Sequence, residues 1–104
     1  MSNILTSNIK NMKVVSVSID VSSKSANTTA EQDVTITGAR TGDLVVVNKP
    51  SSSAGLGVVN ARVKSDDTVS ITYGNFTASG IDPSAETYLL LLVRPEQAGS
   101  DGFM

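Results

Sequence analysis

The chain has 104 residues and a formal net charge of −2, and it contains neither cysteine nor histidine. A chain of this length is typical of one small domain. The two missing residue types exclude disulfides and thiolate metal sites, and they remove the commonest general base and the commonest zinc ligands. We therefore expect no catalytic residues, no metal and no cofactor, and we expect that the protein is not an enzyme.

Charge and hydropathy also argue against nucleic acid and membrane as partners. The chain has no run of Lys and Arg residues, which binding to a phosphate backbone requires. Its longest apolar run, Tyr88 to Val93, is far shorter than the roughly 20 residues that span a bilayer. The N-terminal sequence MSNILTSNIKNMK lacks the apolar segment of a secretory signal, so we expect synthesis in the cytoplasm without export.

Residues 1–12 differ from the rest of the chain. Leu5, Ile9 and Met12 follow a helical spacing, although the Ser and Asn residues around them disfavour an isolated helix. We predict an extended N-terminal arm over residues 1–12 that orders against a partner, with Ile4, Leu5, Ile9 and Met12 as its contact residues. A frayed terminus and an extended first strand are the alternatives.

Period-two alternation predicts the strands that follow. Apolar residues alternate with polar ones from Val15 to Val21, and again at Val34 and Ile36. The run Leu44–Val47 is continuously apolar and rich in β-branched residues, which predicts a buried central strand.

The second half of the chain repeats this pattern. Two alternating runs, 59–63 and 69–73, flank the turn residues Ser65 to Thr68 and predict a hairpin. A last strand is expected over Thr87 to Arg94. The six to seven short strands predict an all-β fold, a small β-sandwich or jelly-roll-like Greek key over residues 13–95, followed by a flexible tail over 96–104.

Several short motifs resemble sites but are better explained as structure. Gly55-Leu56-Gly57 follows a strand, yet a phosphate cradle needs a longer glycine pattern and a following helix. We interpret these glycines as residues that allow a positive φ or a close approach of the backbone. Asp66-Asp67 lacks the alternating carboxylates of a calcium loop and is interpreted as a hairpin turn. Arg62 is expected to face solvent, or to pair with a carboxylate on a partner.

The order and spacing of six segments resemble small β-rich virion proteins of tailed bacteriophages, of the capsid decoration or cement type. The segments run from Val15 to Arg94 and read VSVSIDV, ANTTAEQ, GDLVVVNKP, AGLGVVNARV, SDDTVSITYGNFTA and GIDPSAETYLLLLVR. The resemblance implies a module on the outer capsid surface of the virion, bound to the major capsid protein. It also implies a homo-oligomer, with a trimer favoured, and it carries no catalytic residue across. The alternative is a tail-associated or receptor-binding β-sandwich module, against which the scarcity of aromatic residues argues.

Overall fold

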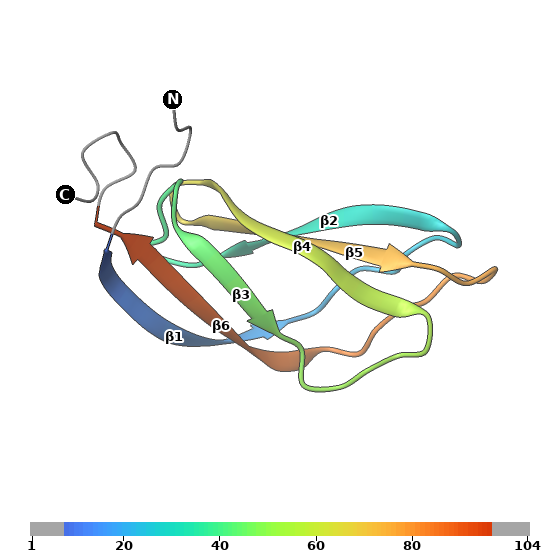
Figure 1. Cartoon of the computed structure of the whole chain (residues 1–104). Helices are drawn as coiled ribbons and strands as arrows, with labels where there is room; N and C mark the ends of the chain where they lie inside the picture. The colour runs from blue at the N-terminus through green and yellow to red at the C-terminus, as the bar shows by residue number, and fades with distance from the viewer. Residues whose placement is uncertain (1–7, 97–104) are drawn as a thin grey trace, which may run out of the picture.

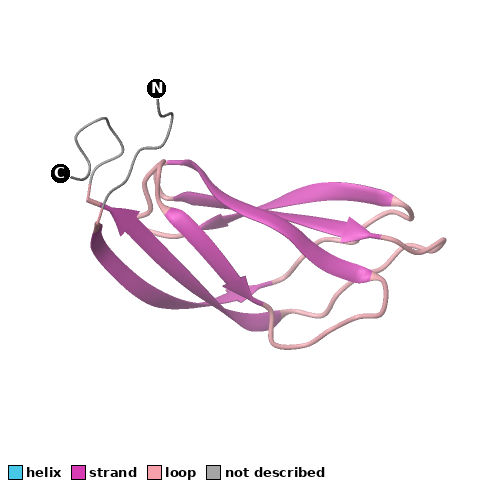
Figure 2. Cartoon of the chain, in the orientation of Figure 1, coloured by secondary structure: helices cyan, strands magenta, loops and turns pink. Residues whose placement is uncertain are grey.

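The structure is a computed structural model that describes residues 8–96, and in that part of the chain it contains strands and no helix. Figures 1 and 2 show two antiparallel sheets, with strand orders β1-β6-β3 and β2-β5-β4. We name each sheet after its central strand, the β6 sheet and the β5 sheet. The predicted all-β class is confirmed. The strands are β1 (Ile9–Ile19), β2 (Thr28–Thr35), β3 (Leu44–Asn48), β4 (Leu56–Ser65), β5 (Thr68–Asn75) and β6 (Glu86–Pro95).

The first strand begins earlier than the sequence pattern indicated. Because β1 starts at Ile9, residues 9–12 pair with β6 as part of the sheet and do not precede it. The extended first strand, one of the alternatives considered for the N-terminal segment, therefore describes these residues. Ile4 and Leu5, like the predicted tail from residue 97 onwards, lie outside the described residues.

The prediction of a buried central strand at Leu44–Val47 is wrong. Strand β3 lies at an edge of the β6 sheet and pairs there only with β6. Its side chains alternate, so that Val45 and Val47 pack against the core while Leu44 and Val46 are 59% and 57% exposed. A continuous apolar run thus marks a strand with apolar side chains on both faces, of which only one is covered.

The core lies between the two sheets, which explains why side chains along the strands alternate between buried and exposed. Inward residues of β5 and β6, such as Ile71 and Leu90, are completely buried. Tyr73 from β5 and Tyr88 from β6 meet in the middle, where the Tyr73 hydroxyl donates a hydrogen bond of 2.9 Å to the Tyr88 hydroxyl. This contact joins the two sheets and satisfies two buried polar groups at once.

The predicted hairpin is confirmed as β4 and β5, joined by Asp66 and Asp67. Asp67 adopts φ 65°, a left-handed conformation that Asp tolerates in tight turns. The turn also anchors the connection between β2 and β3, because the backbone N–H of Ile36 donates to the Asp67 carbonyl at 2.9 Å.

Candidate interaction surface

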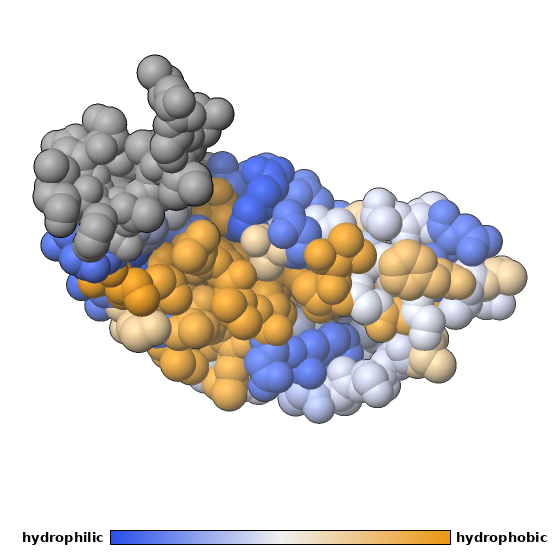
Figure 3. All heavy atoms as spheres, viewed as in Figure 1, coloured by the Kyte–Doolittle hydropathy of each residue, from blue (hydrophilic) through white to orange (hydrophobic). Residues whose placement is uncertain are grey.

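The outer face of the β6 sheet is apolar. The outer face of an antiparallel sheet commonly meets water and carries polar side chains. Here strand register places apolar residues side by side across β1, β6 and β3, in the rows Val14–Leu91–Val46 and Met12–Val93–Leu44, with Leu89 adjoining. Figure 3 shows the resulting continuous hydrophobic area. We call it the apolar face, and its members are Met12, Val14, Leu44, Val46, Leu89, Leu91 and Val93.

Exposure measures how much of the apolar face is uncovered. Val14 is 65% exposed, Met12 52% and Leu89 45%, in addition to Leu44 and Val46 of β3. Together these side chains expose on the order of 500 Å² of apolar surface, which is at the upper end for the largest patch on a monomeric protein. Patches of this size typically mark a surface that binds something.

A β-bulge brings Ile9 to the same side of the sheet. The register of β1 against β6 shifts between Ile9 and Asn11, so that Lys10 is the extra residue. Ile9 is therefore opposite Pro95, which lies on the face of Val93. Of the four predicted contact residues, Ile9 and Met12 thus share one side of the sheet and are 58% and 52% exposed. Their spacing of three, interpreted from the sequence as helical, is accommodated by the bulge in a strand.

The outer face of the β5 sheet has the opposite character in the part that lies toward the β4–β5 turn. Arg62 of β4 pairs with Glu31 of β2 at 3.1 Å, and Lys64 pairs with Asp33 at 3.0 Å. Exposed pairs of this kind contribute little to stability. They do show that this part of the face is polar and exposed to solvent, and they give Arg62 a partner within the chain.

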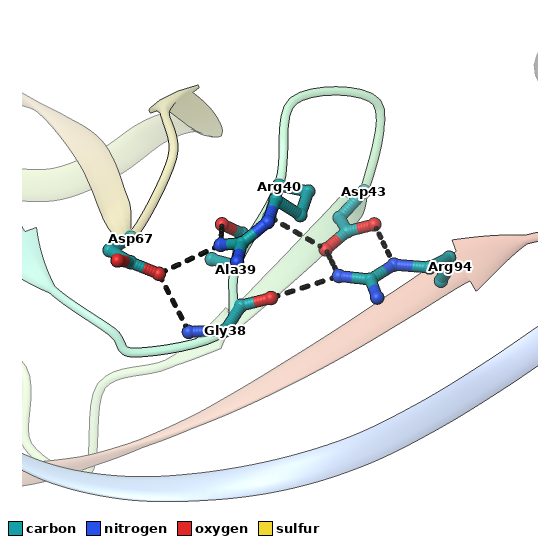
Figure 4. A network of polar contacts seen from close by, with 6 residues as sticks. All are labelled: Gly38, Ala39, Arg40, Asp43, Asp67 and Arg94. Carbon is teal, nitrogen blue, oxygen red and sulfur yellow. Dashed lines mark hydrogen bonds and ion pairs between the residues drawn. The ribbon is translucent and has the colours of Figure 1, made fainter.

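An ion pair fixes β3 beside β6 at one end of the apolar face (Figure 4). Arg94 donates from Nε and Nη2 to the two carboxylate oxygens of Asp43, both at 2.8 Å. Nη2 also donates to the carbonyl of Gly38 at 2.9 Å. The hydrogen bond from Arg94 holds the pKa of the Asp43 carboxyl below its usual value. This bidentate geometry sets the position of Leu44, the next residue along the chain.

The same network reaches the β4–β5 turn. The Asp67 carboxylate accepts hydrogen bonds of 2.8 Å from the backbone N–H of Gly38 and from Arg40 Nη1 (Figure 4). Asp67 therefore stabilises the connection between the sheets, and the bond from Gly38 lowers its pKa. Within residues 8–96, no group of three or more acidic side chains could hold a metal ion.

The glycine-rich loop between β3 and β4 is held as a connection. Gly55 has φ +83°, as expected for a glycine that the turn requires, and the backbone N–H of Leu56 donates to the Ser53 carbonyl at 3.0 Å. Across the loop, Glu86 accepts from Lys49 Nζ and from the Ser51 hydroxyl, both at 2.7 Å. These contacts, the one with Lys49 foremost, lower the pKa of Glu86. Both carboxylate oxygens of Glu86 therefore accept hydrogen bonds that hold the loop.

Sequence reasoning missed most of the apolar face, although a signal was present. The runs Leu44–Val47 and Tyr88–Val93 are continuously apolar. In an antiparallel fold, a strand that is covered on one face usually has apolar residues alternating with polar ones. The additional apolar residues could therefore have indicated that the outer face of these strands is apolar as well as the inner one. What the sequence did not give was the pairing that puts these runs and Met12 side by side.

Comparisons with known proteins supply no further assignment. No family model, no curated protein and no solved structure matches this chain. Among the described residues, no helix has the length and hydropathy needed to cross a membrane. The apolar face is accordingly the feature on which a functional argument rests.

Proposed function

We propose that this protein is a non-enzymatic structural protein of a tailed bacteriophage, which binds the outer surface of the head and stabilises it. Its partner in this proposal is the major capsid protein, and its location is the virion. The observation that carries the proposal is the apolar face, whose side chains are largely exposed in the described part of the chain. The resemblance of residues 15–94 to phage decoration proteins agrees with this role.

The energetics of the apolar face fit attachment in many copies. Burying on the order of 500 Å² at about 25 cal/mol per Å² gives roughly 12 kcal/mol before any cost. Association itself costs about 4–15 kcal/mol, so one copy alone would bind modestly. Linked copies on a repeating lattice raise the effective affinity without new contacts. A protein that binds across a joint between shell subunits then stabilises the joint by mass action.

Assembly of several copies would strengthen attachment. We favour a trimer, since a homo-oligomer would supply the linked copies that the energetics favour. Residues 1–12, with Ile4 and Leu5 ahead of β1, would extend the contact beyond Ile9 and Met12. A jelly-roll-like Greek key connection of the strands belongs to the same proposal.

A charge placed on the apolar face tests the proposal. Val46→Asp and Leu89→Asp each place a carboxylate where the shell would exclude water, whereas Thr35→Asp places one on the polar outer face of the β5 sheet. All three positions are exposed, so we expect all three variants to fold. The measurement is occupancy on purified heads, by co-sedimentation and by reconstruction of the particle.

We expect at least tenfold lower occupancy for the two apolar-face variants and normal occupancy for Thr35→Asp, since an unpaired carboxylate is costly to bury. Wild-type binding should persist at high salt, because the apolar face carries no charged member. Full occupancy of both apolar-face variants would refute the proposed docking mode. Density confined to the tail would replace the head assignment with the tail-associated module.

A further inference from the structure

A second feature lies at the end of the molecule where β5 ends and β2 begins, on the right in Figure 1. Asn27, Thr28, Thr29, Asn75 and Phe76 line an open hollow of about 350 Å³. This volume is in the range of small-molecule sites. Phe76 is 67% exposed, whereas Tyr73 and Tyr88 are completely buried.

The ring of Phe76 lies back over the sheet. A Cβ atom added to Gly74 would be 2.6 Å from Phe76 Cζ and 3.0 Å from Val59 Cγ2, so the absence of a side chain at Gly74 makes room for the ring. Gly74 pairs with Thr29 across the outer face of the β5 sheet. One side of the ring is thus supported by the backbone, and the exposed remainder faces solvent.

The residue before Phe76 fixes the loop from inside. The Asn75 side chain is completely buried, and its amide donates to the carbonyls of Lys24 and Ser79 at 3.1 and 2.9 Å. Its carbonyl oxygen accepts from the Thr77 backbone N–H at 3.0 Å and from the Thr77 hydroxyl at 2.7 Å. The amide therefore uses all its principal hydrogen-bonding groups to hold the loop in one shape.

Backbone bonds complete the support on both sides of the hollow. The N–H of Phe76 donates to the Gly55 carbonyl at 2.8 Å, and the N–H of Asn27 donates to the Thr77 carbonyl at 3.1 Å. Asn27 is in the left-handed region, at φ 53°. A site held this firmly before a ligand arrives has a smaller ordering cost on binding.

The rim of the hollow is polar and uncharged. Asn27, Thr28 and Thr29 are exposed, and no Lys, Arg, Asp or Glu lines the hollow. Within the described part of the chain, the side chains of Asn27 and Thr29 have no hydrogen-bond partner. The Thr28 hydroxyl donates to the Ser25 carbonyl at 2.8 Å, which leaves its oxygen free to accept.

We propose that this hollow binds a neutral saccharide, with a sugar ring stacked on Phe76 and its hydroxyls bonded to Asn27 and Thr29. An exposed aromatic ring beside uncharged donors and acceptors matches a ligand that has one apolar face and many hydroxyls. A charged ligand would find no opposite charge in the lining. The hollow adjoins the outer face of the β5 sheet, opposite to the apolar face, so attachment to a shell leaves it open to a ligand.

The experiment is a titration of the full ¹⁵N-labelled chain with maltotriose, chitotriose and mannotriose at millimolar concentrations, followed by amide chemical shifts. We expect at least one saccharide to shift the amides of Asn27, Thr29 and Phe76 in a saturable manner. Phe76→Tyr should retain binding because it keeps the ring. Phe76→Leu covers Gly74 with an apolar side chain but lacks the ring, and it should bind at least about tenfold more weakly.

Thr35→Ala, at the far end of the same strand as Thr29, is the matched control and should bind as the wild type does. Two outcomes would overturn the proposal. One is the absence of saturable shifts with all three saccharides. The other is binding by Phe76→Leu that equals the wild type while its spectrum shows a native fold. Neither outcome depends on whether the chain docks to a capsid.

Discussion

Removing the hydroxyl of Tyr73 or of Tyr88 should destabilise the protein more than removing both. The two phenols are completely buried, and their hydroxyls bond to each other at 2.9 Å between the sheets. Tyr73→Phe leaves the Tyr88 hydroxyl buried without a partner, and Tyr88→Phe does the same to Tyr73. Each single change should lower the free energy of unfolding by about 1–3 kcal/mol. The double change leaves no orphaned group and should come within about 1 kcal/mol of the wild type.

Urea denaturation of the four proteins gives this double-mutant cycle, with midpoint and slope fitted for each. A domain of this size should also lose about 4–8 °C of melting temperature for each kcal/mol. If the double variant lost the sum of the two single losses, the hydroxyls would be acting independently, and the reasoning from the paired contact would be refuted. An altered slope in a single variant would indicate a changed denatured or native state.

The pKa of Tyr73 provides a second readout of the same contact. Burial, followed by the hydrogen bond to Tyr88, raises the pKa of the Tyr73 phenol far above its ordinary value of 10.0. The unfolded chain therefore ionises first, so the stability associated with the neutral phenol is present below pH 10 and is lost as the pH rises above it. Tyr73→Phe should reduce this alkaline loss, and an unchanged alkaline profile would contradict the assignment.

Two further predictions concern the ion pair and the loop. The hydrogen bond from Arg94 lowers the pKa of Asp43, so the stability that the ionised carboxylate contributes is present above pH 3.8 and should be lost as the pH falls through the lowered pKa. Asp43→Asn should therefore flatten the acid limb of a stability–pH profile. An unchanged acid limb would argue against this pair. Gly55→Ala should destabilise by about 1–2 kcal/mol from the positive φ and by a further amount because the new Cβ would meet Thr77 Cγ2. Gly42→Ala, also at positive φ but with open space around it, should show the conformational part alone in the same urea assay, and equal losses at the two positions would exclude the clash.

Local pattern predicted which segments form strands better than where those strands lie. Alternation at Val15–Val21 and in the hairpin around Asp66 and Asp67 follows from the period-two geometry of a strand, which a short stretch of sequence expresses completely. The start of β1 at Ile9 was missed because the bulge at Lys10 breaks that period, and a helical spacing fits the same residues. The edge position of β3 was missed because hydropathy cannot distinguish burial on two faces from exposure on one.

The candidate surfaces depend on distance in space and not in sequence. Composition established that cysteine and histidine chemistry is absent, and alternation established an all-β chain, because both are properties of single residues or near neighbours. The apolar face exists only because β6 pairs with β1 on one side and β3 on the other, which aligns Val14, Leu91 and Val46. The hollow beside Phe76 likewise requires the β2–β5 pairing, which sets Thr28 opposite Asn75. Register and strand order, set by long-range packing of the core, therefore decided where this protein presents its surfaces, and the sequence by itself determined what those surfaces are made of.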